Sequence, residues 1–405
     1  QQERLPLLPE IMKENEGIRK SITSADGHIY SLPNISEADG RISSSWINKK
    51  WLDKLGLQMP TTADEFYQVL KAFKEQDPNG NGKADEVPIS GYKEGNKNYG
   101  EQLIKTFYGS WGFGGNSGII APYMDVDSQS KVRYIATDNT FKDLITFMNK
   151  LWQEGLIDKE IFSQDMKQEI AKIDDERVGF VAKGNNNLWM GKNRSNYVQN
   201  PVVKGIDGKV YWTGISPKVR ELGSFVITSK NPNPEATLRW ADHFLSEEGT
   251  ALARLGIEGV TYTMGSDGFY KLKDEFAKHP GGLTVDEALS EYTIFQGGGI
   301  PQRVTQKVDQ SAAVLPEMIA NKDVIRPYLV PDEKLMIPTF TEQENIELST
   351  YATDIEAYVD ENIVKFITGA KPLSEWDKYV STLKSMQLDK YLAIYQAAYD
   401  RWNQK

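Results

Sequence analysis

The segment Asp77–Glu86 limits the possible folds of this chain more than any other feature of its sequence. It reads Asp-Pro-Asn-Gly-Asn-Gly-Lys-Ala-Asp-Glu, with oxygen-bearing side chains at its positions 1, 3, 5 and 9 and a glycine at position 6. Alternating oxygen donors with Gly82 at the sharp bend are typical of the opening of an EF-hand calcium loop. The pattern therefore predicts a tight loop, wound around an ion, at the end of a helix.

Calcium takes about six to eight oxygen ligands, so this loop predicts a structural Ca²⁺ site. Position 12 is Pro88, where an EF-hand carries a bidentate glutamate, and we expect Glu86 to replace that ligand. Three carboxylates with amide oxygens favour Ca²⁺ over Mg²⁺, which requires a tighter octahedron. The alternative is a polar turn without an ion. The predicted ligands are the side chains of Asp77, Asn79, Asn81, Asp85 and Glu86 and the backbone carbonyl of Lys83.

Composition excludes several classes of protein. The chain has 405 residues, with 47 Lys and Arg against 57 Asp and Glu, a net charge of −10. Such an acidic chain is a poor partner for nucleic acid or an anionic lipid surface. It has no cysteine, which excludes disulfides, thiolate zinc sites and thiol nucleophiles, and its three histidines do not form an H-E-x-x-H pattern. No run of about 18 apolar residues predicts a membrane span.

Helical and strand-like segments alternate along the chain, which predicts an α/β architecture. Thr62 and Glu65 fit a capping box before a helix, and Asn233-Pro234 fits a second helix start. Apolar residues at helical spacing over the last fifth of the chain predict a helical C-terminus.

Aromatic residues are numerous, with 9 Trp, 19 Tyr and 15 Phe. Several tryptophans stand in Gly- or Asn-rich segments outside periodic runs. Flat aromatic faces pack against the C–H surface of sugar rings, so this distribution is compatible with a carbohydrate ligand. For most of these rings, packing in the core is an equally good interpretation.

Several segments together resemble the extracellular solute-binding proteins of ABC importers (family 1), in the branch of alginate-binding proteins and oligosaccharide-binding lipoproteins. The likeness covers nearly the whole chain, and the succession from Ile47 to Glu86 is its most specific part. The segments that carry it are Ile47–Leu57, Pro60–Thr62, Asp77–Glu86, Gly256–Tyr262, Phe366–Gly369 and Tyr391–Arg401.

The resemblance implies a two-lobed periplasmic-binding-protein fold of type II, in which the chain crosses a hinge three times. We expect crossings near 43–46, 222–226 and 330–340. Lobe 1 would hold 1–46 and 223–330, and lobe 2 would hold 47–222 and 331–405, with the calcium loop 77–86. Family members carry a lipobox cysteine and an opening βαβ stretch ahead of the helix that corresponds to 5–20, so we expect lobe 1 to be incomplete at its N-terminus.

The implied function is the substrate-binding component of an ABC importer, which captures an oligosaccharide between the lobes without catalysis. The implied partners are the sugar and the permease subunits, with no nucleic acid; the protein would be an extracellular, lipid-anchored (or periplasmic) monomer. The alternatives are a calcium-stabilised glycoside hydrolase or lyase, and a peptide-binding protein of the same fold. The candidate ligand-binding residues are Trp46, Trp111, Asn186, Asn187, Trp189, Trp212, Glu258, Tyr262, Gln302 and Arg303.

Overall fold

The computed structural model describes most of the 405 residues. The residues outside the description are 1–5, 39–43, 93–99, 114–121, 185–190, 200–202, 205–207, 209–216, 278, 282, 284, 295–298, 312–325, 330–337 and 405.

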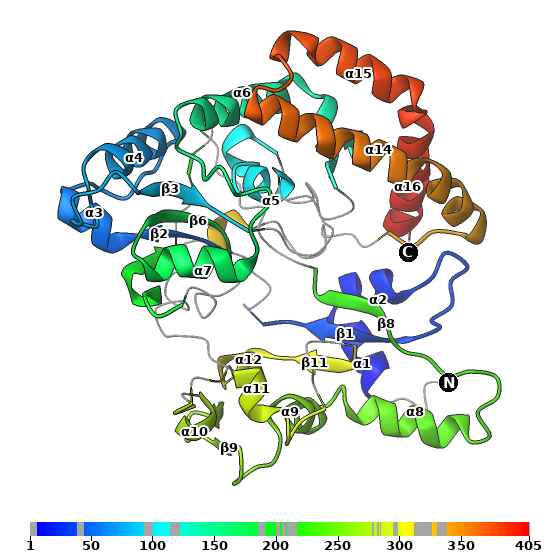
Figure 1. Cartoon of the computed structure of the whole chain (residues 1–405). Helices are drawn as coiled ribbons and strands as arrows, with labels where there is room; N and C mark the ends of the chain where they lie inside the picture. The colour runs from blue at the N-terminus through cyan, green and yellow to red at the C-terminus, as the bar shows by residue number, and fades with distance from the viewer. Residues whose placement is uncertain are drawn as a thin grey trace.

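Two separate sheets organise the described part of the chain (Figure 1). The first sheet has the strand order β11-β1-β8, and the second has the order β3-β6-β2-β7. Two small hairpins, β4-β5 and β9-β10, accompany them. The strands are β1 (Leu32–Ser36), β2 (Ser44–Asn48), β3 (Val87–Ser90), β4 (Met124–Val126), β5 (Val132–Tyr134), β6 (Val178–Gly184), β7 (Tyr197–Gln199), β8 (Val219–Phe225), β9 (Tyr262–Met264), β10 (Tyr270–Leu272) and β11 (Gln302–Val304).

Each sheet mixes parallel and antiparallel pairs. In the first sheet, Ile35 of β1 lies opposite Arg303 of parallel β11 and opposite Val219 of antiparallel β8. In the second sheet, β3 and β6 are parallel, while β2 runs antiparallel to β6 and β7. The chain therefore leaves β1 at Ser36 and enters the other sheet at Ser44.

The helices are distributed unequally between the two sheets. Those that accompany the first sheet are α1 (Leu7–Glu14), α2 (Glu16–Ile22), α8 (Pro234–His243), α9 (Glu247–Leu255), α10 (Asp274–Ala277), α11 (Val285–Leu289) and α12 (Gln306–Ser311). Those that accompany the second are α3 (Lys49–Leu55), α4 (Ala63–Glu75), α5 (Gly100–Lys105), α6 (Asn139–Gln153), α7 (Met166–Asp174), α14 (Glu342–Thr368), α15 (Trp376–Ser385) and α16 (Leu388–Gln404).

The larger body has the larger core. One hydrophobic cluster joins the second sheet to α4, α6 and the three C-terminal helices, and it includes Phe66, Phe180 and Phe366. A smaller cluster joins β1 and β8 to α1, α2 and α8. Because the two sheets have separate cores, each body buries its own apolar surface, as expected for two lobes.

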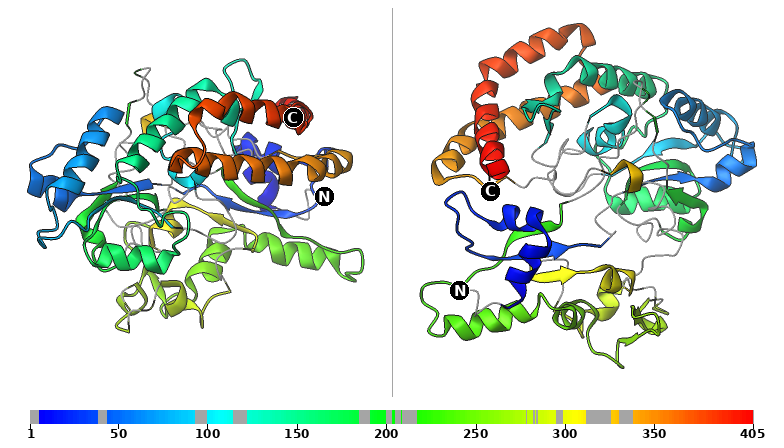
Figure 2. Two further views of the ribbon diagram at one scale, coloured as in Figure 1. Left: turned by 45° about the horizontal axis from the view of Figure 1, so that its top comes forward. Right: turned by 180° about the vertical axis from the view of Figure 1, so that it is seen from behind.

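The two bodies meet where the C-terminal helix returns toward the N-terminal helices. Figure 2 shows the end of α16 beside α2, and the ammonium of Lys20 lies 5.1 Å from the centroid of the Trp402 ring. The predicted helical C-terminus is confirmed. Among the described residues, no helix is long and apolar enough to cross a membrane.

Two predicted lobe boundaries fall inside strands. The boundary after residue 46 cuts β2, and the boundary after residue 222 cuts β8. The whole of β2 belongs to the second sheet and the whole of β8 to the first, because each strand pairs along its full length. Most of the predicted third crossing, at 330–340, lies outside the described residues.

The predicted helix starts show where local chemistry decides structure. The Thr62 side chain caps α4 by accepting a hydrogen bond from the Glu65 amide at 3.2 Å. The Glu65 carboxylate accepts from the amide and hydroxyl of Thr61 instead of completing a capping box. Pro234 is the first residue of α8, as predicted, but the Asn233 side chain makes no capping hydrogen bond.

Candidate functional site

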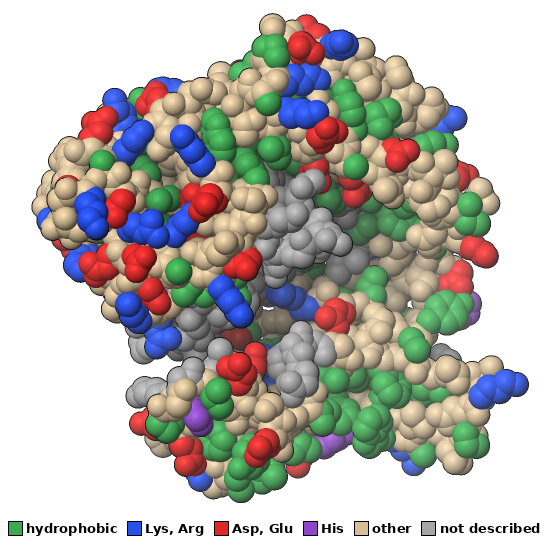
Figure 3. Space-filling model, viewed as in Figure 1, with side chains coloured by type: hydrophobic (Ala, Val, Ile, Leu, Met, Phe, Trp, Pro, Cys, Tyr) green, Lys and Arg blue, Asp and Glu red, His purple; other side chains and the backbone are tan. Residues whose placement is uncertain are grey.

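The carboxyl ends of the parallel strands define the candidate site. In the first sheet β1 and β11 end side by side at Ser36 and Val304, and in the second β3 and β6 end at Ser90 and Gly184. The seven residues from 37 to 43 join these two edges, since β2 starts opposite Gly184. Ligands of open α/β sheets bind outside the carboxyl ends of the strands. Figure 3 shows the molecule hollowed between its two bodies.

An arginine with two carboxylates lies at the edge of the first sheet. The Arg303 guanidinium donates Nε–H to Glu37 at 2.6 Å and Nη2–H to Glu14 at 2.7 Å. Glu37 directly follows β1, and its own amide donates to the carbonyl of Val304 at 2.8 Å. We name this group of three charges the Arg303 array; it links the residue after β1 to β11 and to the end of α1.

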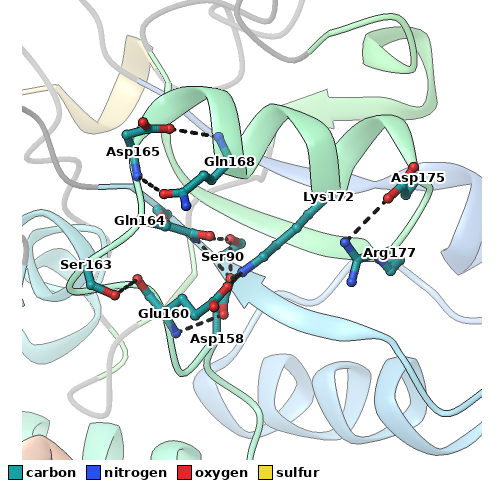
Figure 4. A network of polar contacts seen from close by, with 11 residues as sticks. Ser90, Asp158, Glu160, Ser163, Gln164, Asp165, Gln168, Lys172, Asp175 and Arg177 are labelled. Atoms are coloured by element: carbon teal, nitrogen blue, oxygen red, sulfur yellow. Dashed lines mark hydrogen bonds and ion pairs between the residues drawn. The ribbon is translucent and has the colours of Figure 1, made fainter.

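A lysine with two carboxylates lies at the edge of the second sheet (Figure 4). The Lys172 ammonium on α7 donates to Asp158 at 2.7 Å and to Glu160 at 2.6 Å. We name these three residues the Lys172 array. Asp158 also accepts from the hydroxyl of Ser90, the last residue of β3, at 3.0 Å.

Gln164 completes the polar contacts behind the Lys172 array. It is 1% exposed, and its amide nitrogen donates to Ser90, to the carbonyl of Gly91 and to Asp158. Its Oε1 is buried and has no hydrogen-bond partner among the described residues. Buried polar atoms normally have a hydrogen-bond partner, so this unpaired acceptor beside the end of β3 is unusual among the described residues. No motif in the sequence indicated these residues, since their contacts depend on how α7 docks on the sheet.

The predicted aromatic contacts that the structure describes are packed side chains. Trp46 is 1% exposed and packs with Ile173 and Tyr197 on one face of the second sheet. Trp111 lies in the main core, with its ring centroid 5.0 Å from that of Phe147. Apolar neighbours cover both rings in this structure.

The remaining described candidates differ in exposure. Tyr262 is 6% exposed and packs edge-on against Tyr270, with ring centroids 5.4 Å apart. Gln302 is 1% exposed within β11, whereas Glu258 is exposed. Of this set, only Arg303 lies in a charged cluster at the edge of a sheet. The candidates Asn186, Asn187, Trp189 and Trp212 lie outside the described residues.

The segment Asp77–Glu86 forms a tight turn system between α4 and β3. The Asp77 carboxylate accepts hydrogen bonds from the amides of three loop residues, including Gly82 at 3.0 Å. Gly82 has φ +73°, a left-handed conformation that favours glycine, as the motif predicts. Asn79 and Asn81 each accept from the amide two residues later, so their oxygens are held within the loop.

The surroundings of two carboxylates in this loop shift their pKa values. Oε1 of Glu86 is buried without a hydrogen-bond partner among the described residues. Burial, followed by the negative charges of Asp77 and Asp85, raises the pKa of Glu86 above its usual range. Asp85 accepts from the side-chain amides of Asn81 at 3.0 Å and Asn79 at 3.2 Å, and these hydrogen bonds lower its pKa.

The donor chemistry fits a hard cation, although the geometry differs from a preformed cage. No group of three or more His, Asp or Glu side chains in the described part of the chain is clustered as a metal centre. Asn79 and Asn81 present amide nitrogens to Asp85, and a half-turn of each amide would present oxygens there instead. A cation would also satisfy the buried Oε1 of Glu86, for which the described residues provide no hydrogen-bond partner.

Comparison with known proteins identifies relatives along nearly the whole chain. No family model matches it. The fructooligosaccharide ABC transporter substrate-binding protein FusA of Streptococcus pneumoniae serotype 4 is 31% identical over 410 residues, which cover 98% of this chain and 74% of FusA. The polygalacturonan/rhamnogalacturonan-binding protein YtcQ of Bacillus subtilis is 26% identical over 292 residues, which cover 67% of this chain and 52% of YtcQ.

Solved structures of binding proteins are also similar to this chain. FusA in complex with kestose has a TM-score of 0.74 and 27% identity, covering 98% of this chain and 81% of FusA. The alginate-binding protein AlgQ2 has a TM-score of 0.76 and 25% identity, covering 98% of this chain and 79% of AlgQ2. The chain therefore belongs to the substrate-binding proteins of ABC transporters, and the predicted α/β solute-binding fold is confirmed.

Proposed function

We propose that this protein captures an oligosaccharide between the carboxyl edges of its two sheets and releases it unchanged to an ABC permease. Family membership at 31% identity over nearly the whole chain supports this function most strongly. The names of FusA, YtcQ and AlgQ2 refer to fructooligosaccharides, to polygalacturonan and rhamnogalacturonan, and to alginate respectively. A ligand that binds the closed arrangement of the lobes more tightly than the open one drives closure.

The candidate residues outside the described part of the chain are also proposed to contact the sugar. Asn186, Asn187 and Trp189 directly follow β6, and Trp212 precedes β8, whose first residue lies opposite Ile35 near the end of β1. These positions in the sequence support contacts of both segments with the sugar. Trp189 and Trp212 would stack on sugar rings, and the asparagines would bind hydroxyl groups.

Cell location and assembly complete the proposal. The protein acts outside the cell as a monomer, held at the membrane by a lipid anchor and presenting its sugar to the permease subunits. The family supports this arrangement, because its members work with membrane transporters. The excess of acidic residues supports the absence of nucleic-acid partners.

A structural Ca²⁺ ion in the loop Asp77–Glu86 is part of the same proposal. The carboxylates of Asp77, Asp85 and Glu86, the amide oxygens of Asn79 and Asn81 and the carbonyl of Lys83 would hold it. The buried Glu86 oxygen, which has no hydrogen-bond partner in the described part of the chain, supports the ion. FusA has been solved as an EF-hand mutant and AlgQ2 without calcium ion, so relatives support it as well. The ion would neutralise the loop and stiffen the junction of α4 with β3.

Isothermal titration against a panel of neutral and acidic oligosaccharides and peptides tests the function, followed by chromatography of the recovered ligand. We expect saturable binding of at least one oligosaccharide, recovered intact. Released reducing ends or unsaturated sugars would contradict non-catalytic capture and indicate a hydrolase or lyase. Binding of peptides alone would contradict the carbohydrate ligand.

A further inference from the structure

We propose that the binding cleft selects neutral oligosaccharides and excludes uronic-acid oligomers. This inference rests on the proposed function and specifies its substrate class. It starts from the Arg303 array and the Lys172 array, which lie at the carboxyl edges of the two sheets where the ligand is proposed to bind.

Each array carries more negative than positive charge. Arg303 faces two carboxylates, Glu37 and Glu14, at 2.6 and 2.7 Å. Lys172 likewise faces Asp158 and Glu160, at 2.7 and 2.6 Å. One cation with two carboxylates leaves a net charge of −1 in each array.

The ion pairs of Arg303 and Lys172 are partly shielded from solvent. The side chains of Lys172 and Asp158 are 11% and 6% exposed, and those of Arg303 and Glu37 are 26% and 20% exposed. Short, partly buried hydrogen bonds between a cation and a carboxylate are charge-assisted and strong. Arg303 and Lys172 are therefore already paired with carboxylates of the protein.

A uronate carboxylate beside the two arrays would therefore meet two surplus negative charges, and it would have to displace a protein carboxylate to pair with Arg303 or Lys172. Like charges repel more strongly in a narrow cleft with low-dielectric walls than in open water. A neutral sugar has no such cost, and its hydroxyls can use the outer lone pairs of these carboxylates as acceptors. The overall charge of −10 adds to the repulsion of an anionic ligand.

Titration of three matched trisaccharides tests this selection: kestose, trigalacturonate and the methyl ester of trigalacturonate, each at about 20 and 300 mM salt. We expect a neutral member to bind and trigalacturonate to bind at least tenfold more weakly than its own ester. Trigalacturonate binding as tightly as the ester, or more tightly, would overturn the selection while leaving oligosaccharide capture intact. Binding of no sugar, here or in the wider panel, would contradict the proposed function and this inference with it.

A double variant, Glu14→Gln with Glu160→Gln, tests the electrostatic cause. Both carboxylates are largely exposed, at 60% and 65%, so the fold tolerates the change, and the amide oxygens can still accept from Arg303 and Lys172. We expect the ratio of acid to ester affinity to rise about threefold or more at low salt and less at high salt. Glu16→Gln on α2 serves as a matched control. An unchanged ratio in the double variant would contradict the role of the arrays.

Discussion

Glu356 on α14 illustrates at the scale of one residue how burial raises the pKa of a carboxyl group. Its Oε1 accepts a hydrogen bond from the hydroxyl of Tyr391 on α16 at 2.8 Å. Burial raises the pKa of Glu356, the hydrogen bond from Tyr391 opposes that shift, and the charge of Asp360 adds to it. A carboxyl with a raised pKa in the folded state contributes stability that is complete below its unfolded pKa and is lost as the pH rises through the folded pKa.

We therefore expect Glu356→Gln to remove part of the decline in stability between about pH 4.5 and 7, the range above the unfolded pKa of a glutamate. The amide can still accept from Tyr391 and carries no charge. Melting temperatures of the variant and the parent protein should be similar at pH 4, with that of the variant higher at pH 7. Two parallel pH profiles would contradict this account.

Glu361→Gln is the matched control on the same helix. Its hydrogen bond from Lys365, together with the positive charge of Lys365, lowers the pKa of Glu361. The sign is therefore reversed: the pairing contributes stability above the unfolded pKa and loses it as the pH falls. Because this pair is exposed, we expect a small loss at pH 7 and none at pH 3.

Single residues also show what sequence patterns can and cannot predict. The cap of Thr62 and the turn at Gly82 follow from contacts within a few residues, so local chemistry was enough to predict them. Trp46 was predicted to be a sugar contact from its place near a chain crossing, but its ring faces the core. Which face of a strand is buried depends on the register with distant strands, which no local pattern contains.

At the scale of elements, the Lys172 array ties α7 to the end of β3. We expect Lys172→Met to reduce the free energy of unfolding by about 3 kcal/mol, because Asp158 would keep a buried charge without its cation. Denaturant unfolding measures this loss. Lys50→Met, which breaks the exposed pair with Glu176, should cost less than about 1 kcal/mol. Equal losses in the two variants would contradict the importance of the buried pair.

The loop between α4 and β3 makes a second prediction at this scale. In the parent protein, removal of calcium with a chelator should lower the melting temperature. Glu86→Gln should abolish most of this shift, since it removes a proposed ligand that has no hydrogen-bond partner among the described residues. The metal-free variant should be as stable as the metal-free parent or more stable, because a repulsive charge is gone.

The control for this loop is Glu75→Gln, near the end of α4 and outside the proposed ligand set. It should keep the full response to chelation. A parent protein whose melting temperature is unchanged after exhaustive chelation would contradict the calcium site. So would a Glu86→Gln variant that responds as strongly as the parent.

The arrangement of elements was partly predictable. Alternating helices and strands indicated α/β layers, and the resemblance implied two lobes. The strand pairing places the whole of β8 with β1, and the lobe boundary that the resemblance implies, after residue 222, falls within this strand. The Arg303 array was beyond sequence reasoning, because Arg303 and Glu37 are separated by 266 positions and meet only through parallel pairing of β1 with β11.

At the scale of the whole molecule, two bodies with separate cores present their strand ends to each other across a short connection. Such an arrangement can move as two rigid units about a few connecting residues, since little of either core is shared. Binding energy for a sugar is then available to close the lobes, provided that both edges contact the ligand. The contact of Lys20 with Trp402 marks where the bodies already touch.

The crystal structure of the protein with a bound oligosaccharide tests the central claim most directly. We predict an intact sugar between the two bodies, in contact with residues that follow β1 or β11 on one side and β3 or β6 on the other. A sugar held by one body alone, or on an outer surface away from the ends of these strands, would contradict the account.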